Sequence, residues 1–573
     1  MKHLLSSLIS FSIILSSCSW IEESPTSIIT PSNIQDSDDG AQQWVTGVYS
    51  KWIYDMFCWG YFPKVLEFDA DYISGPDWLF GGFGAGNFQG ESDVTDALWK
   101  GCYGIISRAN LAEQEITKMT HLTPDVQNNA LGEVLFHRAF AYFLLVRAYG
   151  DVPIQSVSIG NDPNTIGNPR APVDSVFAYI IADLQRATNL LYHYEQAEPG
   201  HVSAGSAAGL LAKVYATMAA AATTNCHITV RSGQAYTSVS GNKQYAPLTS
   251  ITITKNAPLK GYENMHPTQL YAQSLRWADS LLTGHFGTYT LLNYDELWKK
   301  TSATASEFLF SVGSVSGDAK YKTSVHTQYE GYYYGQGSEF LASGGWVGCT
   351  RHWYDLFDHD DYRITKGVKH RWRYTFHEQS NSGFYYPQTD EYAIMATGYD
   401  LGGNKHGNPT GIYADGVSYY YSYDSQCLAF TTKYMDVTDP SIENADANFP
   451  MLRLADVILI AAEAANELNE SLRAIAYLNQ VRERSNAQPA TTMDKDALRS
   501  AIIEERAKEL ACEADRRWDL IRWGMYLDAM NALGGKDDSG VNKNRTAHNL
   551  LFPLPISEIN TNPNINSNNE GWN

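Results

Sequence analysis

The sequence predicts a mainly α-helical protein in which a loop-rich block separates two helical regions. Apolar residues recur at three- and four-residue steps through both ends of the chain, which is the spacing of one helix face. Between residues 284 and 450 this periodicity mostly fails, and Gly, Tyr, Ser and Asn become dense. The 573 residues are enough for about three or four average domains and for a large buried core. We therefore expect a helical scaffold that carries a mixed subdomain.

Several of the expected helices have recognisable ends and packing faces. The stretch 126–149 stops at Gly150, and Pro153 follows, as is typical of a helix C-terminus. Small residues such as Ala139 and Ala208 lie on the expected packing faces. The paired helices resemble tetratricopeptide-like hairpins, although the repeat is too degenerate to assign from its period alone. The ranges with helical spacing are 41–57, 92–118, 126–149, 172–192, 203–222, 267–283, 451–468, 471–485 and 494–530.

The N-terminus has the layout of a secretion signal. Lys2 and His3 precede an apolar stretch at residues 4–15, which is too short to span a bilayer well. Residues 15–18, Leu-Ser-Ser-Cys, resemble the lipobox of bacterial lipoproteins, in which the cysteine becomes the acylated first residue of the mature protein. The resemblance makes Cys18 the expected lipidation site. The alternative is ordinary secretion with an incidental thiol at this position.

The residues that follow suit a lipid-anchored surface protein. We expect residues 1–17 to be a lipoprotein signal peptide and residues 18–40, which are rich in Ser, Pro, Asp and Asn towards their end, to be a flexible tether. Glu22 and Glu23, just behind the cysteine, resemble the surface-export signal of Bacteroidetes lipoproteins. The expected location is therefore the outer membrane, with the protein exposed at the cell surface.

Composition limits the partners that the protein can have. The formal net charge is −21, from 42 basic and 63 acidic residues. Such a surface repels phosphate backbones and offers no polybasic patch, so we expect no nucleic-acid partner. The chain has 37 Tyr and 14 Trp, whose flat apolar faces and polar edges are useful at binding surfaces. A neutral or cationic ligand fits these properties best.

Standard catalytic and metal-binding patterns are missing from the sequence. His377-Glu378 lacks the second histidine of a zinc-protease motif, and the Gly-rich stretch 81–90 does not fit the dinucleotide fingerprint. The cysteines are widely spaced, so buried free thiols are expected and a metal is not. We expect no catalytic residue, no cofactor and no metal. A surface glycoside hydrolase stays open as an alternative, because its carboxylates need no fixed spacing in the sequence.

One block near the C-terminus carries acids at a helical spacing. Glu505, Glu509 and Glu513 lie four residues apart, and Arg517 lies four residues beyond the last of them. Arg506 lies three residues before Glu509, and Asp519 lies three residues before Arg522. On one continuous helix this spacing favours intrahelical ion pairs. A catalytic carboxylate pair is the alternative, but each acid has a basic neighbour at pairing distance. We therefore expect a structural network.

Four blocks of sequence are more specific than periodicity. They are ALGEVLFHRAFAYFLLVRAYGDVPI (130–154), FPMLRLADVILIAAEAANELN (449–469), IIEERAKELACEADRRWDLIRWG (502–524) and LLFPLPISEINTNPNIN (550–566). In this order they resemble the SusD/RagB family of outer-membrane nutrient-binding lipoproteins. With the lipobox, the resemblance covers essentially the whole chain. It implies capture of a nutrient and a SusC-like, TonB-dependent outer-membrane transporter as partner.

Two aromatic loops are the candidate ligand site, because sugars bind to exposed aromatic faces flanked by a few polar groups. The loop 71–90 carries aromatic residues among Gly and Pro; the alternative for them is a small core under the loop. In the family, aromatic platforms come from loops that correspond to residues 329–353, which implies Trp346 and one of the neighbouring tyrosines. The expected ligand-binding residues are Trp78, Phe80, Tyr332, Tyr333, Tyr334 and Trp346.

These expectations combine into one organisation and one function. After the signal and the tether we expect an N-terminal helical region at 41–283, a loop-rich ligand-binding subdomain at 284–450 and a C-terminal helical region with its tail at 451–573. The expected function is binding of an oligo- or polysaccharide and its delivery to the SusC-like transporter. The alternatives are peptide binding, as implied for the RagB branch, the hydrolase above, and a scaffold without a small ligand.

Overall fold

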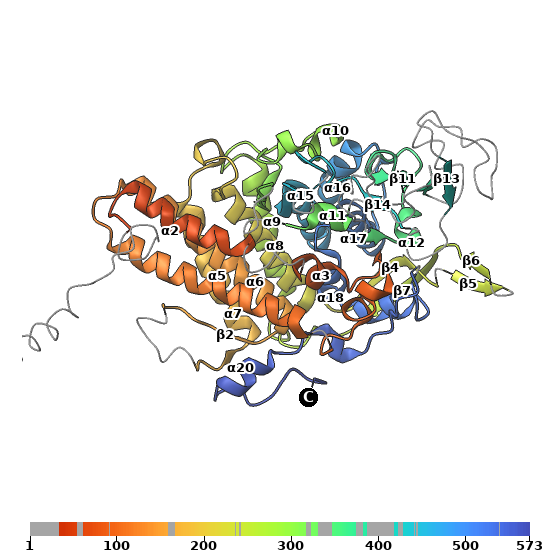
Figure 1. The fold of residues 1–573 in the computed structure, drawn as a ribbon, viewed down its shortest axis with the longest axis horizontal. Helices are drawn as coiled ribbons and strands as arrows, with labels where there is room; N and C mark the ends of the chain where they lie inside the picture. The colour runs from red at the N-terminus through yellow and green to blue at the C-terminus, as the bar shows by residue number, and fades with distance from the viewer. Residues whose placement is uncertain are drawn as a thin grey trace, which may run out of the picture.

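The computed structural model confirms a mainly helical protein (Figure 1). It describes residues 34–53, 61–90, 92–158, 167–234, 236–239, 242–316, 323–329, 346–373, 382–386, 418–421, 428–440, 442, 445–537 and 539–572. Cys18, the signal peptide and most of the tether lie outside these residues, as do Tyr332, Tyr333 and Tyr334.

Long helices pack against their sequence neighbours to form the scaffold. In order they are α2 (Asp38–Lys51), α5 (Ser92–Lys118), α6 (Pro124–Tyr149), α7 (Val173–Leu190), α8 (Ala204–Ala222) and α9 (Pro267–Leu282). From α5 onward each helix contacts the next, and α2 packs on both α5 and α6. Figure 1 shows these helices running side by side, coloured from red at α2 to green at α9. The predicted helices at the N-terminal end are therefore confirmed.

Helix α8 lies at the centre because of its small side chains. Every residue from Ala204 to Ala222 is buried. Ser203 and Ser206 form a capping box that satisfies the free N–H groups at the helix start. The C-terminal helices α15 (Leu454–Glu467), α16 (Ser471–Arg484) and α17 (Lys495–Glu509) complete the packing, with α15 lying against α8 and α9. These helices share one continuous hydrophobic core. The predicted boundaries of the helical regions, at residues 283 and 450, stay predictions.

The remaining helices and all the strands are short. The helices are α3 (Tyr61–Glu67), α4 (Asp77–Phe80), α10 (Tyr294–Leu297), α11 (Val325–Tyr329), α12 (Arg351–Tyr354), α13 (Tyr362–Thr365), α18 (Arg516–Arg522), α19 (Tyr526–Asn531) and α20 (Ile556–Thr561). The paired strands are β1 (Ile73–Ser74) with β9 (Gly348–Cys349), β2 (Val152–Pro153) with β3 (Arg170–Ala171), β4 (Cys226–Ser232) with β7 (Thr249–Lys255), β5 (Tyr236–Val239) with β6 (Asn242–Tyr245), β8 (Phe308–Val312) with β15 (Phe449–Arg453), β10 (Val368–Lys369) with β14 (Phe430–Thr431), and the three-stranded β11 (Arg371–Arg373), β12 (Ser382–Tyr385) and β13 (Ser418–Tyr421).

The β4–β7 ribbon is an element that the helical periodicity did not predict. Its strands pair antiparallel from Cys226 with Lys255 to Ser232 with Thr249. Alternate residues of β4 are buried and exposed, which is the two-residue period of a half-buried strand. The buried ammonium of Lys255 donates to the carbonyl oxygens of Ala220 and Ala221 and so caps the end of α8.

Two predicted helices differ from the structure. The first three residues of the predicted helix 451–468 belong to β15, which pairs antiparallel with β8. The predicted helix 494–530 is three helices, α17, α18 and α19. The break after α17 includes Cys512 and Ala514 with positive φ values of 63° and 66°, so the chain changes direction there. Glu513 and Arg517 consequently do not continue the α17 face.

Glu505, Glu509 and Glu513 form ion pairs with other elements, so the prediction of intrahelical pairs is wrong for these three acids. It is confirmed for Asp519, which pairs with Arg522 within α18 at 2.8 Å. Arg453 of β15, which is fully buried, contacts Glu307 at 2.8 Å, Glu509 at 3.0 Å and Glu513 at 2.6 Å. Arg363 of α13 contacts Glu505 at 2.5 Å. Burial opposes ionisation of Glu509, but Arg484, Arg453 and Arg363 hold its pKa well below its ordinary value. The predicted structural role of Glu505, Glu509 and Glu513 is confirmed, but their ion pairs join different elements of the fold.

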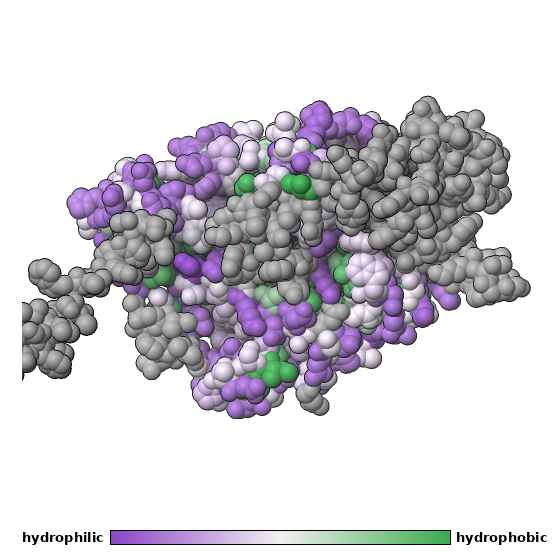
Figure 2. Space-filling model, in the orientation of Figure 1, coloured by the Kyte–Doolittle hydropathy of each residue, from purple (hydrophilic) through white to green (hydrophobic). Residues whose placement is uncertain are grey.

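Outside these networks, the described part of the face in Figure 2 is mostly polar. Hydrophobic residues there form small separate patches, as on an ordinary water-exposed surface.

Replacing Arg453 with Met tests the buried network. We expect Arg453→Met to lower the free energy of unfolding by about 3–5 kcal/mol, because several carboxylates lose their counter-charge in a buried site. Urea or thermal unfolding measures the change. The matched control is Arg473→Met on the exposed face of α16, whose side chain is 41% exposed and pairs with Asp279; we expect a change of about 0–1 kcal/mol there. Equal effects of the two variants would contradict a special role for Arg453.

Candidate functional site

The segment that carries Trp78 begins with three buried acids at alternate positions. We call residues 67–73 the acidic strap. The Asp71 carboxylate accepts two hydrogen bonds from the Arg516 guanidinium, at 2.8 and 2.6 Å. Asp69 pairs with Arg517 and, at 2.7 Å, with Arg545. Each pair joins the strap to the C-terminal part of the chain, so the strap has one defined position.

Glu67 is the third acid of the strap, and its partners among the described residues include no arginine. Its carboxylate accepts hydrogen bonds from the backbone N–H of Ala514 and, at 3.1 Å, from the Tyr329 hydroxyl. Burial raises the pKa of Glu67 from 4.5 to about 7, although the Ala514 N–H opposes the shift. The strap therefore contacts the turn that follows α17.

Two basic side chains hold the backbone around the strap. The buried ammonium of Lys543 donates to the carbonyl oxygens of Ala70 at 3.0 Å and Ile73 at 3.1 Å. Burial lowers the pKa of Lys543 to about 8. Arg545 donates to the carbonyl oxygens of Gly84 at 2.6 Å and Ala85 at 3.0 Å. The same arginine thus fixes the strap before Trp78 and the turn after it.

Strand pairing brings the two predicted aromatic loops together. Ile73 of β1 pairs with Cys349 of β9, and Ser74 pairs with Gly348. The rings of Trp78 and Trp346 then meet edge to face, with centroids 4.8 Å apart and planes at 79°. The side chain of Trp78 is 67% exposed, and that of Trp346 is partly buried. Trp78 therefore presents a large aromatic surface at a fixed place.

Gly75 makes this arrangement possible. A Cβ atom at this position would overlap the carbonyl oxygen of Trp346 and the ring of Phe80. Pro76 follows in an extended conformation and precedes α4, which carries Trp78 in its first turn. The backbone of Trp346 is held in turn by a hydrogen bond from its N–H to the carbonyl oxygen of Gln328, at 2.9 Å. The two loops therefore approach as closely as backbones allow.

The other aromatic residues of the first loop point inward. Phe80 is fully buried and stacks on Phe68, with ring centroids 4.0 Å apart. The expectation that Phe80 presents a face to ligand does not fit this burial, and the small core under the loop accounts for it instead. Phe83 and Phe88 are buried in the same way and contact Phe552. Composition alone does not separate Trp78 from these neighbours.

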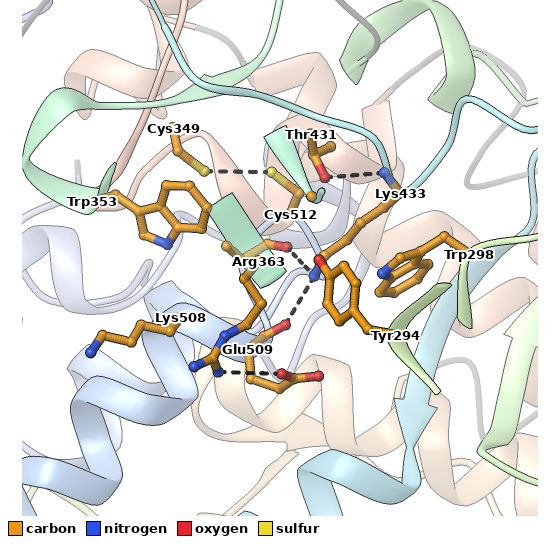
Figure 3. Close-up of a pocket in the computed structure, with 12 residues that line it drawn as sticks. Tyr294, Trp298, Cys349, Trp353, Arg363, Thr431, Lys433, Lys508, Glu509 and Cys512 are labelled. Atoms are coloured by element: carbon orange, nitrogen blue, oxygen red, sulfur yellow. Dashed lines mark hydrogen bonds and ion pairs between the residues drawn. The ribbon is translucent and has the colours of Figure 1, made fainter. Parts of the chain in front are cut away.

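A cavity lies deeper in the molecule, beside α17 (Figure 3). Tyr294, Trp298, Arg363, Lys433 and Glu509 are among its lining residues. It encloses about 10 Å³, room for roughly one water molecule. Its charged groups are already paired, since Arg363 contacts Glu509 and the Lys433 ammonium donates to the Glu509 carbonyl oxygen at 2.9 Å. The cavity is therefore part of the buried ionic network and cannot hold a sugar.

The part of the chain that the structure describes holds no group of three or more His, Cys, Asp or Glu side chains arranged to bind a metal ion. Among the same residues, none of the helices is both long enough and apolar enough to cross a bilayer.

Comparison with known proteins assigns the family. Residues 229–572 match the family model described as the SusD family, and residues 86–216 match a second one, described as starch-binding associating with outer membrane. The chain belongs to the SusD family. The family resemblance of the sequence blocks is thereby confirmed, and the family's description places such proteins at the outer membrane.

Individual SusD-family relatives support the assignment over the whole chain. SusD-like protein P2 of Formosa agariphila is 26% identical over 577 residues, which cover 97% of each protein. The starch-binding protein SusD of Bacteroides thetaiotaomicron is 31% identical over 127 residues, 22% of each protein. A crystal structure of a SusD homologue from Bacteroides thetaiotaomicron aligns with a TM-score of 0.71 at 21% identity, covering 95% of this chain and 98% of that one. A laminarin-binding SusD-like protein aligns with a TM-score of 0.61 at 21% identity, covering 93% and 99%.

Gly75→Ala tests the close approach of the two loops. Because the added methyl group meets backbone, we expect it to push β1 from β9 and to lower the free energy of unfolding by about 1–3 kcal/mol or more. Near-ultraviolet circular dichroism should report altered tryptophan packing. Gly47→Ala in α2 is the control, since its Cβ would meet nothing within 4 Å; it should be neutral or slightly stabilising. Normal packing in both variants would contradict the constraint.

The pH dependence of stability tests the position of Glu67. Its folded-state pKa of about 7 lies above its ordinary value of 4.5, so burial favours the neutral acid. The stability that the folded protein gains from holding Glu67 as the neutral acid is fully present below pH 4.5, the ordinary pKa, and is lost as the pH rises through about 7. We therefore expect Glu67→Gln to gain stability relative to the parent by up to about 3 kcal/mol between about pH 5 and about pH 8.

Thermal unfolding over this pH range measures the effect. Glu570→Gln is the control, because the Glu570 side chain is 87% exposed and its variant should follow the parent at every pH. A constant difference between Glu67→Gln and the parent would show that this carboxyl does not titrate in the strap.

Proposed function

We propose that this SusD-family protein is a surface lipoprotein that binds neutral glycan chains on Trp78 and delivers them to a SusC-like, TonB-dependent transporter. The observation that carries the proposal is the 67% exposure of Trp78 beside Trp346, on a turn held by buried ion pairs. Two adjacent tryptophans, one of them largely exposed, offer the kind of aromatic surface that is enriched at binding sites.

The chemistry of the platform suits a sugar. The C–H face of a pyranose packs on an indole ring, and the ring edge of a second aromatic side chain can limit how the sugar slides. Because the strap and the strand pairing already fix the backbone, little conformational freedom is lost on binding. Tyr332, Tyr333 and Tyr334 stay proposed contacts from the neighbouring loop.

The formal net charge and the relatives both favour a neutral glycan. A net charge of −21 disfavours polyanionic ligands at low ionic strength. One matching family is described as starch-binding, and one similar structure is named a laminarin-binding protein. Starch and laminarin are both uncharged glucose polymers. Peptide binding is the rival, since the charge would also tolerate basic peptides.

The location follows from the N-terminus. Acylation of Cys18 would anchor the protein in the outer membrane, and the tether would let α2 and the scaffold stand off the bilayer. The protein itself is proposed to bind and release glycans without cleaving them, so delivery depends on the transporter.

Alanine substitutions at the two tryptophans test the site. We expect Trp78→Ala and Trp346→Ala to weaken binding of a glucan at least about tenfold, because each removes aromatic surface from the contact. Trp78→Phe should lose less, since a ring remains. Calorimetric titration or affinity electrophoresis on a panel of polysaccharides measures the change.

The matched control is Leu472→Ala in α16, which removes a side chain that is 76% exposed away from the two loops. It should bind like the parent, and glycans should be recovered uncleaved from every sample. Binding of peptides and of no glycan would replace the ligand class. Glycan binding that survives both tryptophan substitutions would move the site elsewhere.

A further inference from the structure

Two cysteines from distant parts of the chain lie side by side in the core. Cys349 ends β9, and Cys512 lies in the turn between α17 and α18. Their sulfur atoms are 3.8 Å apart, and each residue is 1% exposed (Figure 3). The structure shows both of them as buried free thiols, as it does Cys102 and Cys226, for which no such sulfur neighbour is seen among the described residues. The close pair is therefore the distinctive one among the cysteines that the structure describes.

We propose that Cys349 and Cys512 become joined by a disulfide bond as the exported chain folds, which ties β9 to the turn after α17. This inference rests on the proposed export of the protein and not on glycan binding.

The surroundings place the two sulfur atoms within reach of a bond. Bonding needs a separation of about 2.0 Å, so the atoms must approach by about 1.8 Å, shared between two side chains that can each rotate. The backbone of Cys349 exchanges hydrogen bonds with Ala429, at 2.9 and 2.8 Å. The carbonyl oxygen of Cys512 accepts from the Tyr434 hydroxyl at 2.5 Å. Both backbones are thus held while the sulfur atoms face each other.

The reaction is a thiol–disulfide exchange with an oxidised dithiol protein of the cell envelope. One cysteine thiolate attacks the disulfide of that protein, and its leaving sulfur departs as a thiolate. The second cysteine then attacks the mixed disulfide, so the pair loses two protons and two electrons and the partner becomes a dithiol. The contact with Cys349 and, after it, burial raise the pKa of the Cys512 thiol. Exchange is therefore faster before the core closes than after it.

The bond would act at a structurally important place. It closes a loop of 163 residues between β9 and the turn, and long loops restrict the unfolded chain most. Trp346 lies just before β9, and Ala514 of the same turn donates to Glu67 of the acidic strap. The bond therefore fixes the strand beside one tryptophan to the turn that supports the other.

The test uses the full chain produced with its own signal, through an oxidising envelope. The protein is denatured in acid, alkylated without reduction and digested, and the peptides are identified by mass spectrometry. We expect a linked peptide pair containing Cys349 and Cys512, about 2 Da lighter than the two reduced peptides together. Cys102 and Cys226 are internal controls and should be alkylated. Alkylation of both Cys349 and Cys512, or their linkage to Cys58 or Cys427, overturns the proposal.

Thermal unfolding supplies a second readout. Reduction, verified by alkylation of both residues, should lower the Tm of the protein by about 4 °C. The double variant Cys349→Ala/Cys512→Ala should not respond to the same treatment. An unchanged Tm after verified reduction contradicts a stabilising cross-link. A protein that binds no glycan but shows the linked peptides would contradict the proposed function and leave this inference standing.

Discussion

Buried charge pairs between the two ends of the chain hold the rest of the structure in place. Asp71 and Arg516 are 445 residues apart in sequence, and Asp69 and Arg545 are 476 apart. Burying such an acid without its partner would cost far more than the pair contributes. The acidic strap can therefore dock only on a C-terminal region that is already formed, and the exposed Trp78 depends on a fold completed hundreds of residues later.

Charge also sets the register between the scaffold and the loop-rich block. The acids Glu505 and Glu509 of α17 receive arginines from three other elements: Arg363, Arg453 and Arg484. An apolar interface of the same area would be at least as stable, but it would tolerate sliding more readily than guanidinium groups that need matched oxygen positions. We interpret the network as a device for alignment. It explains why strongly charged side chains are buried in a protein with this much apolar core.

Local sequence patterns predicted the helices of the scaffold. The features that they did not predict depend on contacts between residues far apart in the sequence. Helices α5, α6 and α8 could be predicted because their burial follows from periodicity or small side chains along one segment. The break after Glu509 could not, since acids continue at four-residue steps while the turn is stabilised by Glu67 from far away. Trp78 and Phe80 lie in the same loop, and tertiary packing separates them: Phe80 is buried against Phe68, Gly75 and Gly84, whereas Trp78 stays exposed.

The turn after α17 is where the supports of both tryptophans meet. Cys512 contacts Cys349 of β9, and Ala514 contacts Glu67 of the strap. Both Cys512 and Ala514 adopt positive φ values, which cost residues with a Cβ about 1 kcal/mol or more each. Such a conformation persists only where the surroundings impose it. The unfavourable backbone conformations thus lie in the buried turn at Cys512 and Ala514. Neither Trp78 nor Trp346 has a positive φ value.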